Sequence, residues 1–352
     1  MRRLIRFLFL KPILWLVHRF SSSPDRDRIF AALTKLKGQL QDDPGKKGFV
    51  IPWEIHKGKF ILFSDQHKGI KNGADDFALA EQNYVAALEH YYQEGFHLIC
   101  LGDCEELWEN RLHQVKKHNT LSFDAEKKFA LRNVFTKIFG NHDLDWEINP
   151  MANNDLKELY EVPVVVLEGV ILQTTIEEKS FHIFCTHGHQ GDLQSDGNLF
   201  SKFFVSKIWA PLQAYLRINP NTPAYSETLK TEHNNIMYEW SSHQQDLLLI
   251  TGHTHQPVFE SLTQLERFQR KEAMKQSEQG PQDRMTVPTM DFFSKIKPTY
   301  FNTGCCCYDD GDITGIEIAD GFIKLIKWEE INGKSTRAEL EKISLSELAK
   351  QL

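Results

Sequence analysis

Apolar positions in the first third of the chain follow two different patterns, a helical period and uninterrupted runs. Between residues 75 and 93 they recur at helical spacing, which predicts an amphipathic helix that ends at Gly95. These positions are Phe77, Ala80, Tyr84, Ala87, Leu88 and Tyr91. Uninterrupted apolar runs stand on both sides of it, in "KFILFSDQH" (59–67) and "FHLICLGD" (96–103), and have the length of buried strands. A strand, a helix and a second strand in this order predict an α/β sheet.

Further strands are predicted in the second half of the chain. The run "VPVVVLEGVILQTTI" (162–176) predicts a hairpin that turns near Glu168-Gly169, and "FHIFCTHG" (181–188) and "DLLLIT" (246–251) predict single strands. A late hairpin is predicted in "GIEIADGFIKLIKWEE" (315–330), with Asp320-Gly321 at its turn. The final stretch, "STRAELEKISLSELAKQL" (335–352), has the pattern of an amphipathic helix.

These elements predict one main domain over residues 51–330. It is preceded by a basic, apolar segment and linker over 1–50, with a short helix around Ile29–Leu40, and followed by a C-terminal helix over 331–352. A long polar and aromatic stretch at about 190–248 predicts a helical insertion. The charged, glutamine-rich residues at about 260–290 predict an exposed excursion or mobile loop.

Charge is unevenly distributed along the chain, which has a net charge of -7. Residues 1–20 contain five basic side chains and no acidic one, so the remaining chain sums to -12. The basic side chains and a proline interrupt the apolar residues of this segment too often for a spanning helix, and a signal peptide is not indicated. Its composition fits either a helix lying in a membrane interface or a terminal helix packed on the domain.

The net charge and the number of cysteines limit the classes of protein to which the chain can belong. The negative net charge argues against a general nucleic-acid binder. Six cysteines, three of them consecutive at 305–307, do not suggest a disulfide framework and favour a reduced, intracellular compartment. We therefore expect a cytoplasmic protein, with residues 1–20 as the candidate contact with the inner face of a membrane.

Polar side chains with metal-binding chemistry follow five of the apolar runs. They are Asp65-Gln66-His67, Gly102-Asp103, Asn141-His142, His187-Gly188-His189 and Gly252-His253-Thr254-His255. Taken alone, each block has an ordinary explanation, such as a turn, because Asn, Asp and Gly are common turn residues. The last block is more suggestive, because alternating histidines on an extended segment point the same way. Five in series at the carboxyl ends of predicted strands indicate a shared binding edge. Carboxylate and imidazole donors suit Mn, Fe, Zn, Co or Ni, and two such ions placed close together can activate water for phosphoryl displacement.

In order and composition, the blocks "DQH", "GDCEE", "GNHD", "HGH" and "GHTH" resemble the calcineurin-like metallophosphoesterase superfamily, over roughly Lys59 to Trp328. The resemblance implies a four-layer αββα sandwich of two mixed sheets flanked by helices, with two divalent metal ions at the strand ends and manganese as the first candidate. It implies a first metal on Asp65, His67 and His255, a bridging Asp103, and a second metal on Asn141, His187 and His253. It also implies that His142 contacts the phosphate and protonates the departing oxygen, and that Glu106 orients His142.

Several neighbouring residues have two interpretations. His189 is an alternative ligand to His187, Asp192 is either a partner for an imidazole or a turn residue, and Glu105 either lines the site or begins a solvated helix. Cys104 is expected in packing, and the turn 302–304 at the rim of the site. The three consecutive cysteines are not expected as ligands, because the oxygen and nitrogen donors already complete the set.

The resulting hypothesis is a metal-dependent hydrolase of a phosphoester or pyrophosphate bond, in a small or lipid-linked substrate. The acidic "GDCEELWE" block and the basic apolar N-terminus resemble the branch that cleaves UDP-2,3-diacylglucosamine, although the chain is longer than those enzymes usually are. A nuclease-like phosphodiesterase and a non-catalytic scaffold that keeps the fold are the alternatives. Because one fold hosts many activities, the residues of the site have to decide among these three hypotheses.

Overall fold

The computed structural model describes residues 24–73, 75–191, 227–279 and 293–352, and its strands form two mixed sheets. The first sheet contains, in spatial order, β1 (Gly48–Pro52), β6 (Gly169–Ile176), β7 (Lys179–Thr186), β8 (Leu247–Thr251), β11 (Tyr300–Asn302), β9 (Val258–Phe259) and β10 (Leu262–Thr263). The second contains β14 (Lys334–Ser344), β13 (Phe322–Ile331), β12 (Ile313–Ala319), β2 (Phe60–Phe63), β3 (His97–Leu101), β4 (Phe135–Ile138) and β5 (Val166–Leu167).

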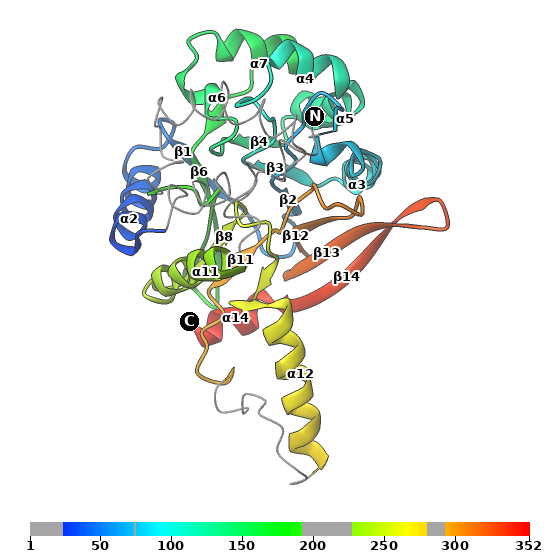
Figure 1. Cartoon of the computed structure of the whole chain (residues 1–352). Helices are drawn as coiled ribbons and strands as arrows, with labels where there is room; N and C mark the ends of the chain where they lie inside the picture. The colour runs from blue at the N-terminus through cyan, green and yellow to red at the C-terminus, as the bar shows by residue number, and fades with distance from the viewer. Residues whose placement is uncertain (1–23, 74, 192–226, 280–292) are drawn as a thin grey trace, which may run out of the picture.

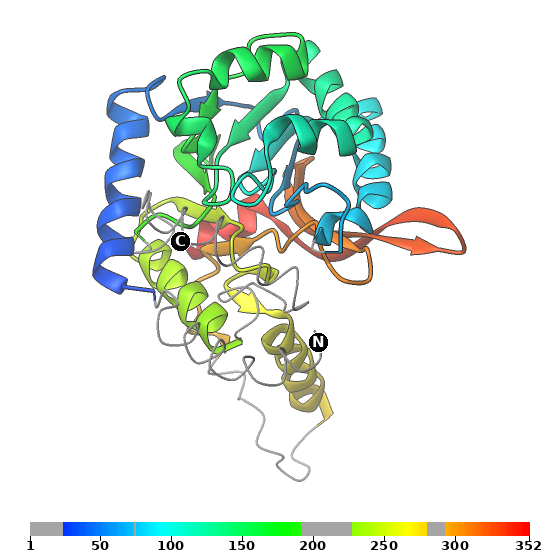
Figure 2. The same ribbon diagram turned by 45° about the horizontal axis from the view of Figure 1, so that its top comes forward.

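Helices cover the outer face of each sheet (Figures 1 and 2). Helices α2 (Arg26–Asp42) and α11 (Glu227–Ser242) pack on the first sheet, and α3 (Glu81–Gln93) and α5 (Thr120–Leu131) on the second, with α7 (Ala152–Tyr160) against α5. The shorter elements are η1 (Asp76–Ala78), α4 (Leu112–His118), α6 (Asp145–Ile148) and α14 (Leu345–Gln351). Helix α12 (Gln264–Gln279) projects away from the body of the molecule.

The central strands are buried on both faces, which explains their uninterrupted apolar sequences. In β2, Phe60 and Leu62 point into the core between the sheets, whereas Ile61 and Phe63 pack against the helices on the outer face. The same alternation holds for β3, with Ile99 and Leu101 between the sheets. The predicted four-layer sandwich of two mixed sheets between helices is therefore confirmed.

Two predicted elements are wrong. No hairpin forms at Glu168-Gly169: β5 pairs with β4 in the second sheet, while β6 pairs with β1 and β7 in the first, so the chain passes between sheets at this point. The C-terminal stretch is not helical throughout, because β14 pairs with β13 along its whole length and only α14 is helical. Glu317 on β12 joins Lys324 on β13 and Arg337 on β14 at 2.7 Å each, an ion-pair ladder that stabilises this pairing.

The predicted domain boundaries at 50/51 and 330/331 both lie inside strands, β1 and β13. The helix predicted at Ile29–Leu40 is present as the longer α2, with four buried side chains on the first sheet. The late hairpin at Asp320-Gly321 is confirmed between β12 and β13.

Part of each predicted excursion lies outside the described residues. Of the insertion at 190–248, residues 192–226 are not described, and α11 and β8 lie at its end. Of the predicted exposed excursion or mobile loop at 260–290, the described residues 260–279 contain β10 and the projecting helix α12 (Figure 1), so this part is not a loop. Thr263 and Glu266 cap it reciprocally, since the Thr263 N–H donates to Glu266 Oε2 at 2.8 Å. Residues 1–20 lie outside the description, and none of the described helices has the length and apolarity to span a bilayer.

Candidate metal centre

All predicted site residues lie where strands of the two sheets end at their carboxyl termini. Asp65 and His67 follow β2, Asp103 follows β3, Asn141 and His142 follow β4, His187 follows β7, and His253 and His255 follow β8. Backbone hydrogen bonds hold the loops together within each sheet, from the Asp65 N–H to Gly102 O and from the Gly252 N–H to His187 O, both at 3.0 Å. The His253 N–H donates to Asp65 Oδ2 at 2.9 Å, which joins the two sheets at the site.

Two glycines allow these loops to approach each other. A Cβ added at Gly140 would lie 2.2 Å from Asp103 Oδ1, and one at Gly102 would lie 2.6 Å from the His187 ring. Gly102 also has a φ of 88°, which glycine adopts without strain. The glycines that precede Asp103 and Asn141 in the sequence therefore make room for the site and do not merely mark turns.

The backbone of the site is strained. Asp65, His67, Asp103, His253 and His255 all have φ between 50° and 70°, the left-handed region, which costs side-chain-bearing residues roughly 1–2 kcal/mol each. Such conformations persist only where the surrounding structure enforces them, and they are concentrated at functional sites. Five of the seven predicted metal ligands are left-handed, and the pattern of apolar positions gave no sign of it.

Donor atoms of the predicted ligands converge in the interior of the site. Within the described residues, three groups each have donor atoms that all lie within 4.8 Å of one another. Two of them are His67, Asp103 and His142, of which His142 is not a predicted ligand, and Asp103, His187 and His253. Asp103 is a member of both groups. A third group brings His67 and His255 together with Cys307. Asp65 adjoins this third group, since its Oδ1 lies 3.2 Å from His255 Nε2.

Several of these buried atoms lack hydrogen-bond partners among the described residues. They are Asp65 Oδ1, Asn141 Oδ1, His187 Nε2 and His253 Nε2. His187 Nε2 lies 3.1 Å from Asp103 Oδ2 without the geometry of a hydrogen bond. The Nδ1 of His187 lies 2.8 Å from the carbonyl oxygen of Leu101, so Nδ1 carries the proton and Nε2 is the ring atom available to a cation. Buried oxygen and nitrogen atoms that have a free lone pair and no hydrogen-bond partner among the described residues are suited to bind divalent cations.

Glu106 contacts two imidazoles rather than the one predicted. Its Oε2 accepts from Nδ1 of His142 at 2.6 Å and lies 3.2 Å from Nδ1 of His67. Burial disfavours the charged form of His142, but the Glu106 and Asp103 carboxylates outweigh it and raise the pKa of the imidazole above its ordinary value. Burial likewise opposes ionisation of Glu106, and the neighbouring His142 nevertheless lowers the pKa of Glu106 to about 2.

Trp108 is a part of the site that the motif analysis missed. Its indole stacks on the His142 ring, with centroids 4.7 Å apart and planes 16° from parallel. The His142 N–H also donates to Asp103 Oδ1 at 2.7 Å. His142 is therefore held on one ring face by Trp108, at Nδ1 by Glu106 and at its backbone by Asp103. The "ELW" that follows the "GDCE" block was the only signal of this contact in the sequence.

The structure decides between the two interpretations of most of the residues that neighbour the predicted ligands. His189 is buried beside His187, with ring centroids 5.4 Å apart, and belongs to none of the donor groups in the described residues. Glu105 neither lines the site nor begins a solvated helix, because it is buried in an ion pair with Lys137. Cys104 packs in the core, and Asp192 lies outside the described residues. Asn302 is buried beneath the "GHTH" loop rather than at the rim, and its Nδ2 donates to Gly252 O at 2.6 Å.

Comparisons with known proteins give distant similarities only. No family model matches the chain, and no curated protein matches it. Vacuolar Protein Sorting 29 from Cryptosporidium parvum aligns over 82% of this chain and 98% of its own, with 13% identity and a TM-score of 0.31. A dimetal phosphatase from Danio rerio aligns over 82% and 98%, with 9% identity and a TM-score of 0.37. Zinc-complexed Vps29 from Entamoeba histolytica aligns over 82% and 99%, with 12% identity and a TM-score of 0.26. At this level of similarity the function has to be argued from the geometry of the site.

Proposed function

We propose that the chain is a metal-dependent phosphoesterase that hydrolyses a phosphoester or pyrophosphate bond with the help of two divalent cations. The observation that supports this most strongly is that the Asp103 carboxylate has a donor atom of His67 within 4.8 Å in one group and donor atoms of His187 and His253 within 4.8 Å in another. Asp103 Oδ2 lies 3.8 Å from His67 Nε2 and 3.1 Å from His187 Nε2, so this oxygen faces the ligands of both proposed cations, and such pairs of ions act in phosphoryl transfer.

The donor atoms fit two cations of borderline hardness. Asp65, His67, Asp103 and His255 would hold one, and Asp103, Asn141, His187 and His253 the other. Oxygen and imidazole nitrogen donors suit Mn, Fe, Zn, Co or Ni, and we take Mn as the first candidate to test. When bound, the two ions supply a water of lowered pKa and positive charge that stabilises the attacking and leaving oxygens.

The remaining chemistry belongs to His142. Glu106 accepts the Nδ1 proton of His142 and favours the cationic imidazole, so Nε2 has a proton to donate to the departing oxygen. Trp108 covers one face of the ring and fixes the direction in which this proton points. A scaffold without activity would not need an imidazole held at three points, which favours the enzyme over that alternative. The net charge of -7 disfavours a nuclease.

The proposal is tested by manganese-dependent hydrolysis of p-nitrophenyl phosphate and bis-p-nitrophenyl phosphate. We expect turnover by the wild type and a loss of about 10²–10⁴-fold in kcat for His142→Asn, the range that proton transfer contributes. Asp103→Asn should lose activity and metal together. His113→Asn and Asp124→Asn, at exposed positions outside the site, are matched controls and should retain wild-type rates. An inert wild type with both cations bound would support the scaffold instead, and lipid-linked pyrophosphates would be the next substrates to test.

A further inference from the structure

The segment that contains the three consecutive cysteines is fixed to both halves of the first cation's proposed site. It follows β11, and the Cys306 N–H donates to the carbonyl oxygen of Asp65 at 3.2 Å. The Tyr308 hydroxyl donates to the carbonyl oxygen of His255 at 3.2 Å. Cys307, between these two anchors, is buried. Its position is therefore determined by the same backbone that positions Asp65 and His255.

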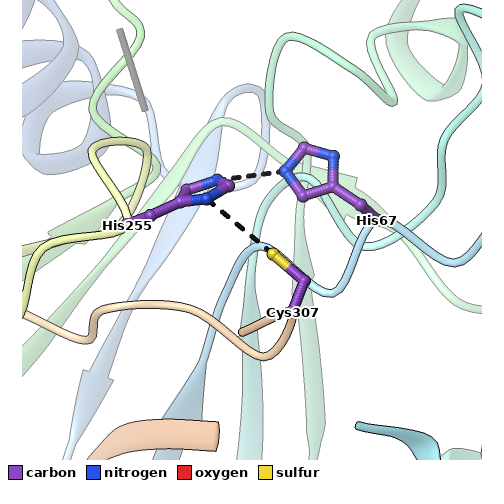
Figure 3. Close-up of side chains that lie close together, drawn as sticks. All are labelled: His67, His255 and Cys307. Atoms are coloured by element: carbon purple, nitrogen blue, oxygen red, sulfur yellow. Dashed lines mark hydrogen bonds between the residues drawn. The ribbon is translucent and has the colours of Figure 1, made fainter. Parts of the chain in front are cut away.

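The two ring nitrogens of His255 face different partners (Figure 3). Nε2 lies 3.2 Å from His67 Nε2 and 3.2 Å from Asp65 Oδ1, on the side where the predicted ligands gather. Nδ1, on the other side of the ring, lies 3.8 Å from the sulfur of Cys307. That distance is within the range of a hydrogen bond to sulfur. Cys307 thus contacts the ring nitrogen that the metal-ligand side does not use, and Cys305 lies close enough to interact with both His255 and Cys307.

We propose that Cys307 is a positioning residue for the first cation: its sulfur accepts the Nδ1 proton of His255 and leaves the lone pair of Nε2 directed at the cation. This inference rests on the proposed function, because it assigns a role toward the cation of that site. A histidine that binds a metal usually donates its other N–H to a neighbouring acceptor, which fixes the tautomer and the ring orientation. For His255 the acceptor at this position is a thiol sulfur, not the more usual carboxylate or carbonyl.

The competing arrangement is direct ligation by the thiolate of Cys307. Donor atoms of His67, His255 and Cys307 lie within 4.8 Å of one another, close enough for all three to reach one ion. The position of the sulfur beside Nδ1, rather than beside Nε2, favours the positioning role. The two arrangements differ in whether a metal–sulfur bond forms, and that bond has a spectroscopic signature.

Cobalt(II) binding to the full chain tests the proposal with readouts that are independent of turnover. Cobalt affinity would be measured by competition with a chromogenic chelator, and the near-ultraviolet absorbance of the cobalt-loaded protein would be recorded. We expect two cobalt ions per chain, no sulfur-to-cobalt charge-transfer band, and a loss of about 10–100-fold in affinity at one site in Cys307→Ala. Cys307→Ser retains an acceptor and should recover part of this loss. Cys306→Ala, whose sulfur contacts Thr314 O instead, is the matched control on the same segment and should bind cobalt as the wild type does.

Each other outcome overturns the inference in a distinguishable way. Unchanged affinity in a folded Cys307→Ala variant would show that the thiol does not position His255. A charge-transfer band that disappears in Cys307→Ala would show that Cys307 is a ligand. Equal losses in Cys307→Ala and Cys306→Ala would reduce its role to packing. A wild type that binds no cobalt would instead remove the proposed function itself, since the donor groups would then hold no cation.

Discussion

A neutral network of four buried charges lies beneath the candidate metal centre, and it offers a sharp prediction about stability. Lys68, Glu105, Glu126 and Lys137 are all fully buried. Lys137 Nζ lies 2.9 Å from the Glu105 carboxylate, Lys68 Nζ lies 3.2 Å from it, and Lys68 also pairs with Glu126. The Trp146 N–H donates to Glu105 Oε2 at 2.7 Å. Burial lowers the pKa of Lys137, but the neighbouring anions outweigh it and raise that pKa above its ordinary value.

Lys137→Met removes one cation from this network while retaining most of its side-chain volume. Removing one partner of a buried ion pair typically costs about 3–5 kcal/mol, because the other charge remains buried without compensation. Glu105 keeps Lys68 and the Trp146 N–H, which places the expected loss in the free energy of unfolding at the lower end, about 3 kcal/mol. Glu105 stands between Cys104 and Glu106, so the same variant should also loosen the loop that holds Asp103 and Glu106.

Urea unfolding followed by far-ultraviolet circular dichroism at pH 7 measures this loss. Lys117→Met, at an exposed position on α4, is the matched control and should change the stability by no more than about 0.5 kcal/mol. The double variant Lys137→Met/Glu105→Gln should lose less than the sum of the two single variants, because neither charge is then left alone. A loss below about 1 kcal/mol in Lys137→Met would refute the reasoning, since it would mean that Glu105 does not depend on this cation.

Two further predictions concern a histidine and a glycine. His97 contacts Thr136 Oγ1 at 2.8 Å, and burial lowers the pKa of His97 from 6.5 to about 4. The unfolded chain therefore binds this proton more tightly than the folded chain does. The contribution of neutral His97 to the free energy of unfolding is present above pH 6.5 and is lost as the pH falls towards 4. Urea titrations should show that the free energy of unfolding falls by about 2 kcal/mol between pH 7 and pH 5, and His97→Gln should abolish this fall. An equal fall in the variant would rule out His97 as its source. Gly140→Ala places a Cβ 2.2 Å from Asp103 Oδ1 and should lower cobalt affinity at least 10-fold by displacing that carboxylate. Gly38→Ala in α2 has open space around it and should instead raise the free energy of unfolding by up to about 1 kcal/mol. Unchanged cobalt binding in a folded Gly140→Ala variant would contradict the role of Asp103.

The parts of the fold that could be predicted from the sequence are those in which local pattern and tertiary burial agree. Strands β2 and β3 are buried on both faces, so their apolar runs were sufficient to identify them. The donor blocks were predicted at strand ends because carboxyl-terminal edges of such sheets collect ligands. Strand β14 was predicted as part of a helix because its few apolar positions fit a helical period, whereas its pairing depends on partners in β12 and β13.

Other features depend on contacts between segments that are distant in the sequence. The passage from β5 to β6 looked like a hairpin because both strands are apolar and Glu168-Gly169 stands where they meet, yet each strand pairs in a different sheet. The contact of Cys307 with His255 joins residues 52 positions apart, and the burial of Glu105 depends on Lys137 in another strand. Neither the stacking of Trp108 nor the left-handed backbone of the ligands leaves a periodic trace in the sequence.

The central claim is that one carboxylate, Asp103, lies between two cations. Manganese(II) titration followed by electron paramagnetic resonance tests it directly, because two ions joined by a bridging carboxylate are magnetically coupled. We predict two manganese ions per chain with a spin-coupled multiline spectrum, and its loss in Asp103→Asn but not in Asp124→Asn. A single uncoupled ion per chain, or a coupled spectrum that survives in Asp103→Asn, would contradict the account.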